Sequence, residues 1–199
     1  MKKLLSIVFV FAIIVSCNNK TKVVGGVKEK TYDTAFNEKI QGMFFGVSFG
    51  DNKEEVISKL KAHDFAYDNY SSSDVLLHFR SKNEKYFSFG NMPWEMLDIS
   101  MSSDKFYHIR FMNSSEDKAT VISSYEHVLS TVSAKYKMME ETPKDSTVYR
   151  LSVGYTRGHP RRLVIVSCFR YESLSKHILQ GYTLEYSDEE SYSDVNYEL

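Results

Sequence analysis

The sequence predicts an α+β fold made of two units, each a helix followed by antiparallel strands, with both helices packed on one face of an antiparallel sheet. Two segments, 51–63 and 114–137, carry apolar residues at helical spacing, and the segments after each of them alternate between apolar and polar residues. The chain therefore divides into possible halves at 42–113 and 114–186, although no sequence repeat supports a duplication.

The first helix is expected to have Asp51 as its N-cap, because Glu54 follows at the spacing of a capping box. It ends near His63, and one face carries the apolar residues Val56, Ile57 and Leu60. Four strands are expected next, most of them with the alternation of half-buried strands. Their ranges are 75–80, 86–90, 97–102 and 106–112.

The second helix has the clearest pattern in the chain. Ser114 and Asp117 have capping-box spacing, and the helix ends near Lys135 and Lys137, whose charges suit the helix dipole. Its apolar positions are Val121, Ile122, Tyr125, Val128, Leu129, Val132 and Tyr136. Three strands are expected after it, at 149–155, 162–171 and 178–186, and the middle one is apolar on both faces and therefore central.

The first seventeen residues have the pattern of a signal peptide. A positive start at Lys2 and Lys3 precedes the apolar run 4–15, which is too short to span a bilayer. The run ends in Ile14-Val15-Ser16-Cys17, which resembles the lipobox of bacterial lipoproteins. The resemblance implies cleavage after residue 16 and a diacylglycerol on the Cys17 thiol, with a further acyl chain such as palmitate on the new amine.

An anchor with two or more acyl chains holds a protein on its membrane stably. By analogy with lipoprotein sorting, Asn18 in place of aspartate favours the outer membrane, and the absence of an acidic run after Cys17 favours the periplasmic face. We expect a signal peptide at 1–16, a lipidated cysteine and flexible tether at 17–41, one domain at 42–186 and a frayed acidic tail at 187–199.

Residues 44–56 resemble the opening of small helix-then-hairpin lipoprotein domains. One such family is the SmpA/OmlA type, an accessory lipoprotein of outer-membrane barrel assembly, and the β-lactamase-inhibitor-protein fold has a similar layout. The shared features are a glycine or small polar turn, a helix opening with Glu54-Glu55-Val56 and a strand meander. The resemblance covers about a third of the chain, and a closer one is to uncharacterised lipoproteins of Gram-negative anaerobes.

Composition limits the classes of partner. Removal of Lys2 and Lys3 with the signal peptide leaves 23 basic against 26 acidic residues, which gives no reason to expect nucleic-acid binding. If Cys17 is lipidated, Cys168 has no intramolecular partner, and its apolar surroundings indicate a buried, inert thiol. The sequence contains no catalytic, phosphate-binding or metal-binding motif, so we expect no enzyme, no cofactor and no metal.

A few residues remain as candidates for binding. His78 and His108 fall on the polar faces of two expected strands, where they could meet as metal ligands or a base, although solvated histidines are the simpler interpretation. A basic turn could bind an anion or a partner, or be a solvated loop; it consists of Arg157, His159, Arg161 and Arg162.

Trp94 lies in an aromatic turn and, if exposed, would indicate a partner or glycan site; the simpler interpretation is a tryptophan that caps the sheet edge. Thr34 and Ser146 match a short O-glycosylation pattern of some Gram-negative anaerobes, and both fall in an expected linker or loop.

Three classes of function remain. The anchor, the tether and the missing catalytic motifs favour a non-enzymatic adapter or scaffold that binds an envelope protein through a sheet face or edge. The alternative is a periplasmic carrier of a small ligand or lipid headgroup, which requires an enclosed pocket, ideally near Arg161 and Arg162. A hydrolase or inhibitor would need polar residues that converge in a cleft, which the sequence does not show.

Overall fold

A computed structural model describes residues 36–157, 161–173 and 175–189. The expected signal peptide, the lipobox with Cys17, Thr34, His159 and the end of the acidic tail lie outside these residues. The described part contains two helices and thirteen strands, and no helix in it is long and apolar enough to cross a membrane.

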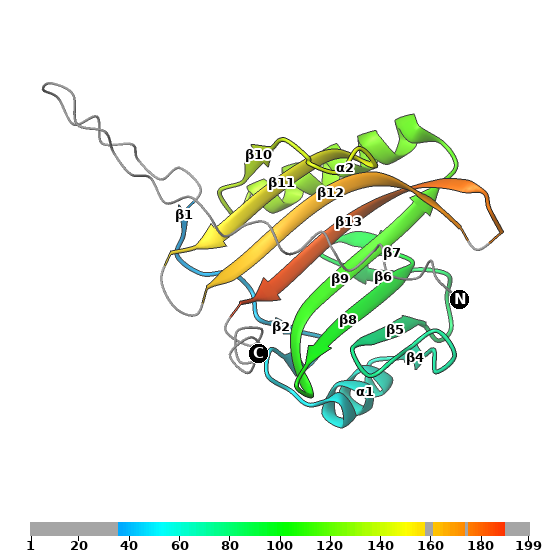
Figure 1. The fold of residues 1–199 in the computed structure, drawn as a ribbon. Coiled ribbons are helices and arrows are strands. Elements are labelled where there is room, and N and C mark those ends of the chain that lie inside the picture. Colours follow the sequence, from blue (N-terminus) through cyan, green and yellow to red (C-terminus); the bar gives the residue numbers. More distant parts are fainter. Residues whose placement is uncertain (1–35, 158–160, 174, 190–199) are drawn as a thin grey trace, which may run out of the picture. The chain divides into compact units, whose positions relative to one another are not determined.

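One large sheet organises the described residues (Figure 1). Its strand order is β1-β11-β12-β13-β9-β8-β5-β4, and β10 also pairs with β11. All pairs are antiparallel except β1 with β11. The strands are β1 (Phe36–Asn37), β4 (Phe65–Tyr67), β5 (Leu76–Ser81), β8 (Met96–Ser102), β9 (Lys105–Ser115), β10 (Met139–Glu141), β11 (Val148–Thr156), β12 (Arg162–Glu172) and β13 (Ile178–Asp188).

The predicted fold class is wrong. Nearly half of the described residues are in strands, and the strands form one continuous sheet rather than two helix-then-strands units. The two expected halves join where β13 pairs with β9, with Leu184 opposite Phe111 and Tyr186 opposite Ile109. Alternation identifies a strand but not its partner, so the pattern could not show that apolar residues from the two halves meet on one sheet face.

Two small hairpins lie beside the large sheet. The first consists of β2 (Met43–Phe44) and β3 (Val47–Ser48), and the second of β6 (Phe87–Phe89) and β7 (Met92–Trp94). Strands of two or three residues are too short to show alternation. Of these four strands only β6 was predicted, as part of the longer strand expected at 86–90.

The N-cap of helix α1 (Lys53–Ala62) lies one residue later than predicted. Its N-cap is Asn52, whose side chain accepts a hydrogen bond from the backbone N–H of Glu55, while the Glu55 carboxylate accepts one from the Asn52 backbone. Asp51 instead accepts hydrogen bonds from the Ser48 backbone N–H and from Lys59. Val56 and Leu60 are buried, as expected of the apolar face.

Helix α2 (Lys118–Ser133) is shorter than predicted at both ends. Asp117, not Ser114, is the N-cap and accepts hydrogen bonds from the backbone N–H groups of Ala119 and Thr120. Ser114 belongs to β9. The predicted apolar positions hold, since the residues buried on this helix are Val121, Tyr125, Val128 and Val132.

Both helices share one hydrophobic core with one face of the sheet. Trp94 and Tyr125 are the largest fully buried side chains of this core. A smaller cluster of Val153, Leu163 and Ile165 lies on the other sheet face. Along β12, Leu163 and Ile165 alternate with Val164 and Val166 of the main core, and Val153 of β11 pairs with Ile165.

The folded domain extends beyond the expected limits of 42 and 186. Ile40 is only 1% exposed and belongs to the core, and the Asn37 side chain exchanges hydrogen bonds with the Lys137 backbone. Ser187 and Asp188 are buried at the end of β13. The end of the predicted tether and the start of the predicted tail are therefore part of the fold.

Candidate functional site

Trp94 is not an exposed partner contact. Its side chain is fully buried, its ring lies 5.8 Å from that of Phe111, and its indole N–H donates a hydrogen bond to the Phe89 carbonyl at 3.1 Å. It closes the β6–β7 hairpin onto the core, and it lies inside the main core rather than at an edge of the large sheet.

The basic turn is largely neutralised within the described residues. Arg162 pairs with Asp188 at 3.2 Å, donates to the Ile40 carbonyl and lies over the Phe49 ring. Arg161 pairs with Glu189 at 3.2 Å. Arg157 is exposed. The ion pairs therefore make an open anion site at Arg161 and Arg162 a poor interpretation of this turn.

His78 and His108 do not face each other, because β8 lies between their strands. Each is instead paired with a carboxylate: His78 Nδ1 lies 2.6 Å from Asp98 Oδ1, and His108 Nε2 lies 2.9 Å from Glu185 Oε2. Across the described residues no group of three or more metal-binding side chains forms. The hypothesis of a metal site at this pair is therefore wrong for the part of the chain that the structure describes.

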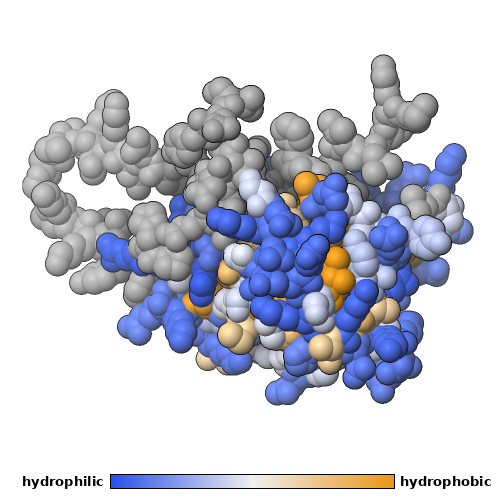
Figure 2. Space-filling model, turned by 90° about the horizontal axis from the view of Figure 1, so that it is seen from below, coloured by the Kyte–Doolittle hydropathy of each residue, from blue (hydrophilic) through white to orange (hydrophobic). Residues whose placement is uncertain are grey.

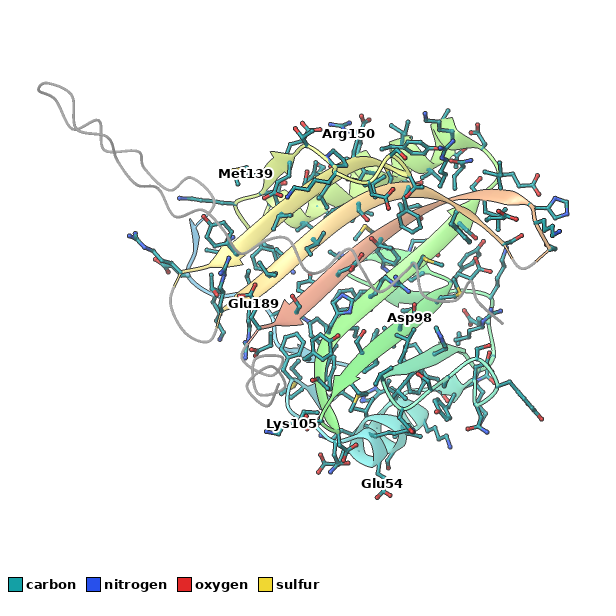
Figure 3. All side chains as sticks on the ribbon, viewed as in Figure 1. Glu54, Asp98, Lys105, Met139, Arg150 and Glu189 are labelled. Atoms are coloured by element: carbon teal, nitrogen blue, oxygen red, sulfur yellow. The ribbon has the colours of Figure 1, made fainter. Side chains whose placement is uncertain are left out.

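These pairs belong to a polar network on the sheet face opposite the main core. Asp98, labelled in Figure 3, accepts two hydrogen bonds from Arg110, and Glu185 accepts one from Thr183 as well as pairing with His108. Burial opposes the charge of Asp98, but the hydrogen bond from His78 and the charge of Arg110 outweigh it and lower the pKa of Asp98. Burial likewise opposes the charge of Glu185, and His108 together with Arg110 lowers its pKa.

In the same network a serine, a histidine and a carboxylate are hydrogen-bonded one to the next. Ser100 Oγ lies 3.1 Å from His108 Nδ1, whose other ring nitrogen meets Glu185. A hydrolase would also need donors for an oxyanion and a cleft for its substrate. Neither of the two hollows described below is lined by these three residues. We therefore assign the network a structural role in tying β5, β8, β9 and β13 together.

A groove of about 680 Å³ lies between the β4–β5 end of the sheet and the β6–β7 hairpin. Its floor is aromatic: the Phe45 and Phe65 ring centroids are 4.9 Å apart, and those of Phe65 and Phe87 are also 4.9 Å apart. Tyr86 projects at the rim and is 42% exposed. Apolar surface lined by polar edges is the usual composition of a binding site.

Phe45 reaches this floor from an unusual backbone position. It has a φ of 49° and precedes Gly46 with a φ of 79°, so the β2–β3 turn has two left-handed residues. Glycine and asparagine favour such turns, and a bulky ring does not. The contacts of Phe45 with the rings of Phe65, Phe87 and Phe89 offset this cost.

Two carboxylates are the acidic groups of the groove lining. Asp64 follows α1 with a φ of 62°, and Glu84 lies in the loop after β5; both side chains are exposed. No hydrogen-bond or ion-pair partner of either carboxylate lies within the described residues. Lys85, on the same loop but outside the lining, places its ammonium 4.9 Å from the Tyr86 ring centroid.

Strand β4 has an open edge beside this groove. The ladder with β5 includes hydrogen bonds from Lys82 N–H to the Asp64 carbonyl and from Asp68 N–H to the His78 carbonyl. Along an antiparallel ladder, hydrogen-bonded pairs alternate with non-hydrogen-bonded pairs. Since the backbones of Asp64 and Asp68 are bonded to β5, the N–H and C=O groups of Phe65 and Tyr67 point away from β5. Their partners are not found in the described part of the chain.

A second hollow, of about 700 Å³, lies at the end of α2 and is lined in part by Lys39, Lys135 and Lys137. Basic groups at this position also complement the helix dipole. Both hollows are open, and neither is lined by Arg161 or Arg162. The enclosed pocket that the carrier alternative requires near those arginines is therefore not among them.

Ser146 is exposed in the turn before β11, where Asp145 accepts hydrogen bonds from the backbone and hydroxyl of Thr147. This exposure would permit glycosylation but does not test it, and the idea stays a prediction.

A comparison with protein-family models, curated proteins and solved structures finds no match for this chain. The groove was not anticipated by the sequence interpretation, although Phe44-Phe45-Gly46 carried a signal: aromatic residues directly before a glycine that starts a hairpin.

Proposed function

We propose that this protein is a non-enzymatic adapter of the cell envelope, anchored to the outer membrane through lipid on Cys17, which binds a protein partner in the groove beside β4. The open edge of β4 carries this proposal. An exposed strand edge presents N–H and C=O groups in the spacing that an extended segment needs, and such a segment can add to the sheet as a further strand.

The groove supports the same function. Main-chain hydrogen bonds along an edge provide affinity but little selectivity, and pockets next to the edge select the side chains of the bound segment. Phe65 belongs to both features, because its backbone lies on the open edge and its ring forms part of the floor. A segment paired with β4 would therefore place side chains against Phe45 and Phe87.

The test is site-specific photo-crosslinking in intact envelopes. A photo-reactive phenylalanine replaces Tyr86 at the groove rim or, as a matched control, Ser130, which is exposed on α2. The proposal predicts a discrete crosslinked protein from position 86 and none of the same mass from position 130. Equal products from both positions, or none from position 86, would contradict it.

The anchor is tested in the same experiment with Cys17→Ala. Loss of the lipid should reduce the yield of the crosslink at position 86. Labelled palmitate should be incorporated by the wild type and not by the Cys17→Ala protein, and equal labelling of the two would exclude the proposed lipidation.

A further inference from the structure

We infer that the segment bound in the groove is an extended polypeptide that carries a lysine or arginine two positions from an apolar or aromatic residue. This inference rests on the proposed function and specifies the chemistry of the partner. It combines three independent features of the groove: its charge, its aromatic surface and the open edge of β4.

The charge of the lining favours a cation. Asp64 and Glu84 are exposed, and neither carboxylate has a partner within the described residues. Both lie at the same end of the β4–β5 pair, Asp64 just before β4 and Glu84 just after β5. A basic side chain that enters the groove would find two acceptors that form no competing ion pair there.

The aromatic rings favour the same cation and add a site for its apolar neighbour. The face of an aromatic ring attracts an ammonium or guanidinium group, as the Lys85 ammonium over the Tyr86 ring illustrates at the rim. The half-buried rings of Phe45 and Phe87 offer apolar surface below it. Long basic side chains also bury their own methylene groups against such surface.

The open edge of β4 selects a peptide rather than a free amine. Phe65 and Tyr67 offer backbone groups with the two-residue spacing of a strand. In a paired segment, alternate side chains point to the same side, so a basic and an apolar residue two positions apart would both face the groove.

The probe is a library of random heptapeptides displayed on phage and selected against the full-length protein. The inference predicts enrichment of sequences with lysine or arginine two positions from an aromatic or aliphatic residue. The combined variant Asp64→Asn and Glu84→Gln should weaken binding of a synthetic selected peptide roughly tenfold, since two exposed ion pairs of ordinary strength contribute about that much.

Three controls make the outcome decisive. The variant Glu116→Gln with Glu172→Gln removes the same charge at exposed positions away from the groove and should leave affinity unchanged. About 1 M salt, which shortens the Debye length to about 3 Å, should reduce the difference between groove variant and wild type. Circular dichroism of each variant confirms folding.

The results separate this inference from the function on which it rests. Enrichment of neutral or acidic peptides, together with a partner crosslink at position 86, would overturn the inference and leave the adapter function standing. Absence of any enriched peptide and of the crosslink would overturn both. Equal affinity of the groove variant and its charge-matched control for the selected peptide would also overturn the inference.

Discussion

At the residue scale, Phe45 shows how packing of a side chain can stabilise an unfavourable backbone conformation. The left-handed region costs a bulky residue on the order of 1 kcal/mol or more. The ring contacts four other phenylalanine rings, those of Phe65, Phe87, Phe89 and Phe111. A hydrophobic residue at a turn position that suits asparagine is therefore a sign of tertiary packing.

Substitution of Phe45 tests this balance. Phe45→Ala should lower the free energy of unfolding by about 2 kcal/mol, less than for a fully buried phenylalanine, because the ring is only partly buried. Phe45→Asn should be less destabilising than Phe45→Ala, since asparagine tolerates the left-handed region. Urea unfolding measures both, and a larger loss for asparagine would contradict the account.

The N-cap of α1 gives a second test at this scale. Asn52→Ala should cost about 1 kcal/mol of stability, whereas Asn52→Ser should cost much less because serine also caps helices well. Thermal unfolding of the two variants distinguishes them, and similar losses in both would argue that Asn52 does not cap the helix.

At the scale of elements, the network from His78 to Glu185 ties four strands by their side chains. Asp98 has a lowered pKa because the hydrogen bond from His78 and the charge of Arg110 outweigh its burial. A group whose pKa is lowered by folding contributes stability above its unfolded pKa, and this contribution is lost as the pH falls through the folded pKa. The same holds for Glu185.

Acid should therefore destabilise the fold in a way that depends on Asp98. The free energy of unfolding of the wild type should begin to fall at about pH 5 and should fall further as the pH drops below the usual carboxylate pKa of about 4. Asp98→Asn should be less stable by about 3 kcal/mol at neutral pH, because it leaves Arg110 without its carboxylate, and should lose less on acidification. Urea unfolding across this range tests both, and an unchanged pH dependence would exclude Asp98 as a source.

At the scale of the whole molecule, the single sheet replaces the two units that the sequence pattern favoured. The seven expected strands are all present, and the predicted apolar faces of both helices are buried, because alternation and helical spacing are local properties. The pairing of β13 with β9 is not local, since Gln180 and Ser115 are far apart in the chain. It depends on which apolar faces complement each other, and a single sequence does not encode that visibly.

The site was less predictable than the fold for the same reason. Trp94 and the basic turn stood out by residue type. In the structure, however, Trp94 is buried and hydrogen-bonded in the core, and Arg161 and Arg162 form ion pairs within the chain. The groove unites Phe45, Asp64 and Glu84 with the β6–β7 hairpin, and only tertiary structure brings them together.

The continuous sheet predicts one cooperative unit. Residues 42–113 or 114–186 expressed alone should not fold, because each half would lose the β9–β13 pairing and half of the shared core. Near-ultraviolet and far-ultraviolet circular dichroism of the full chain should give coincident unfolding curves. A folded half, or two separate transitions, would contradict this description.

The central claim is that a partner adds to the open edge of β4, and a matched pair of variants at Tyr67 tests it most directly. Tyr67→Pro removes the outward N–H, and Tyr67→Ala removes the same ring but keeps that donor. The account predicts that the crosslink at position 86 in intact envelopes is lost in Tyr67→Pro and retained in Tyr67→Ala, with both proteins folded. Equal crosslinking of the two folded variants would show that the partner does not pair with this edge.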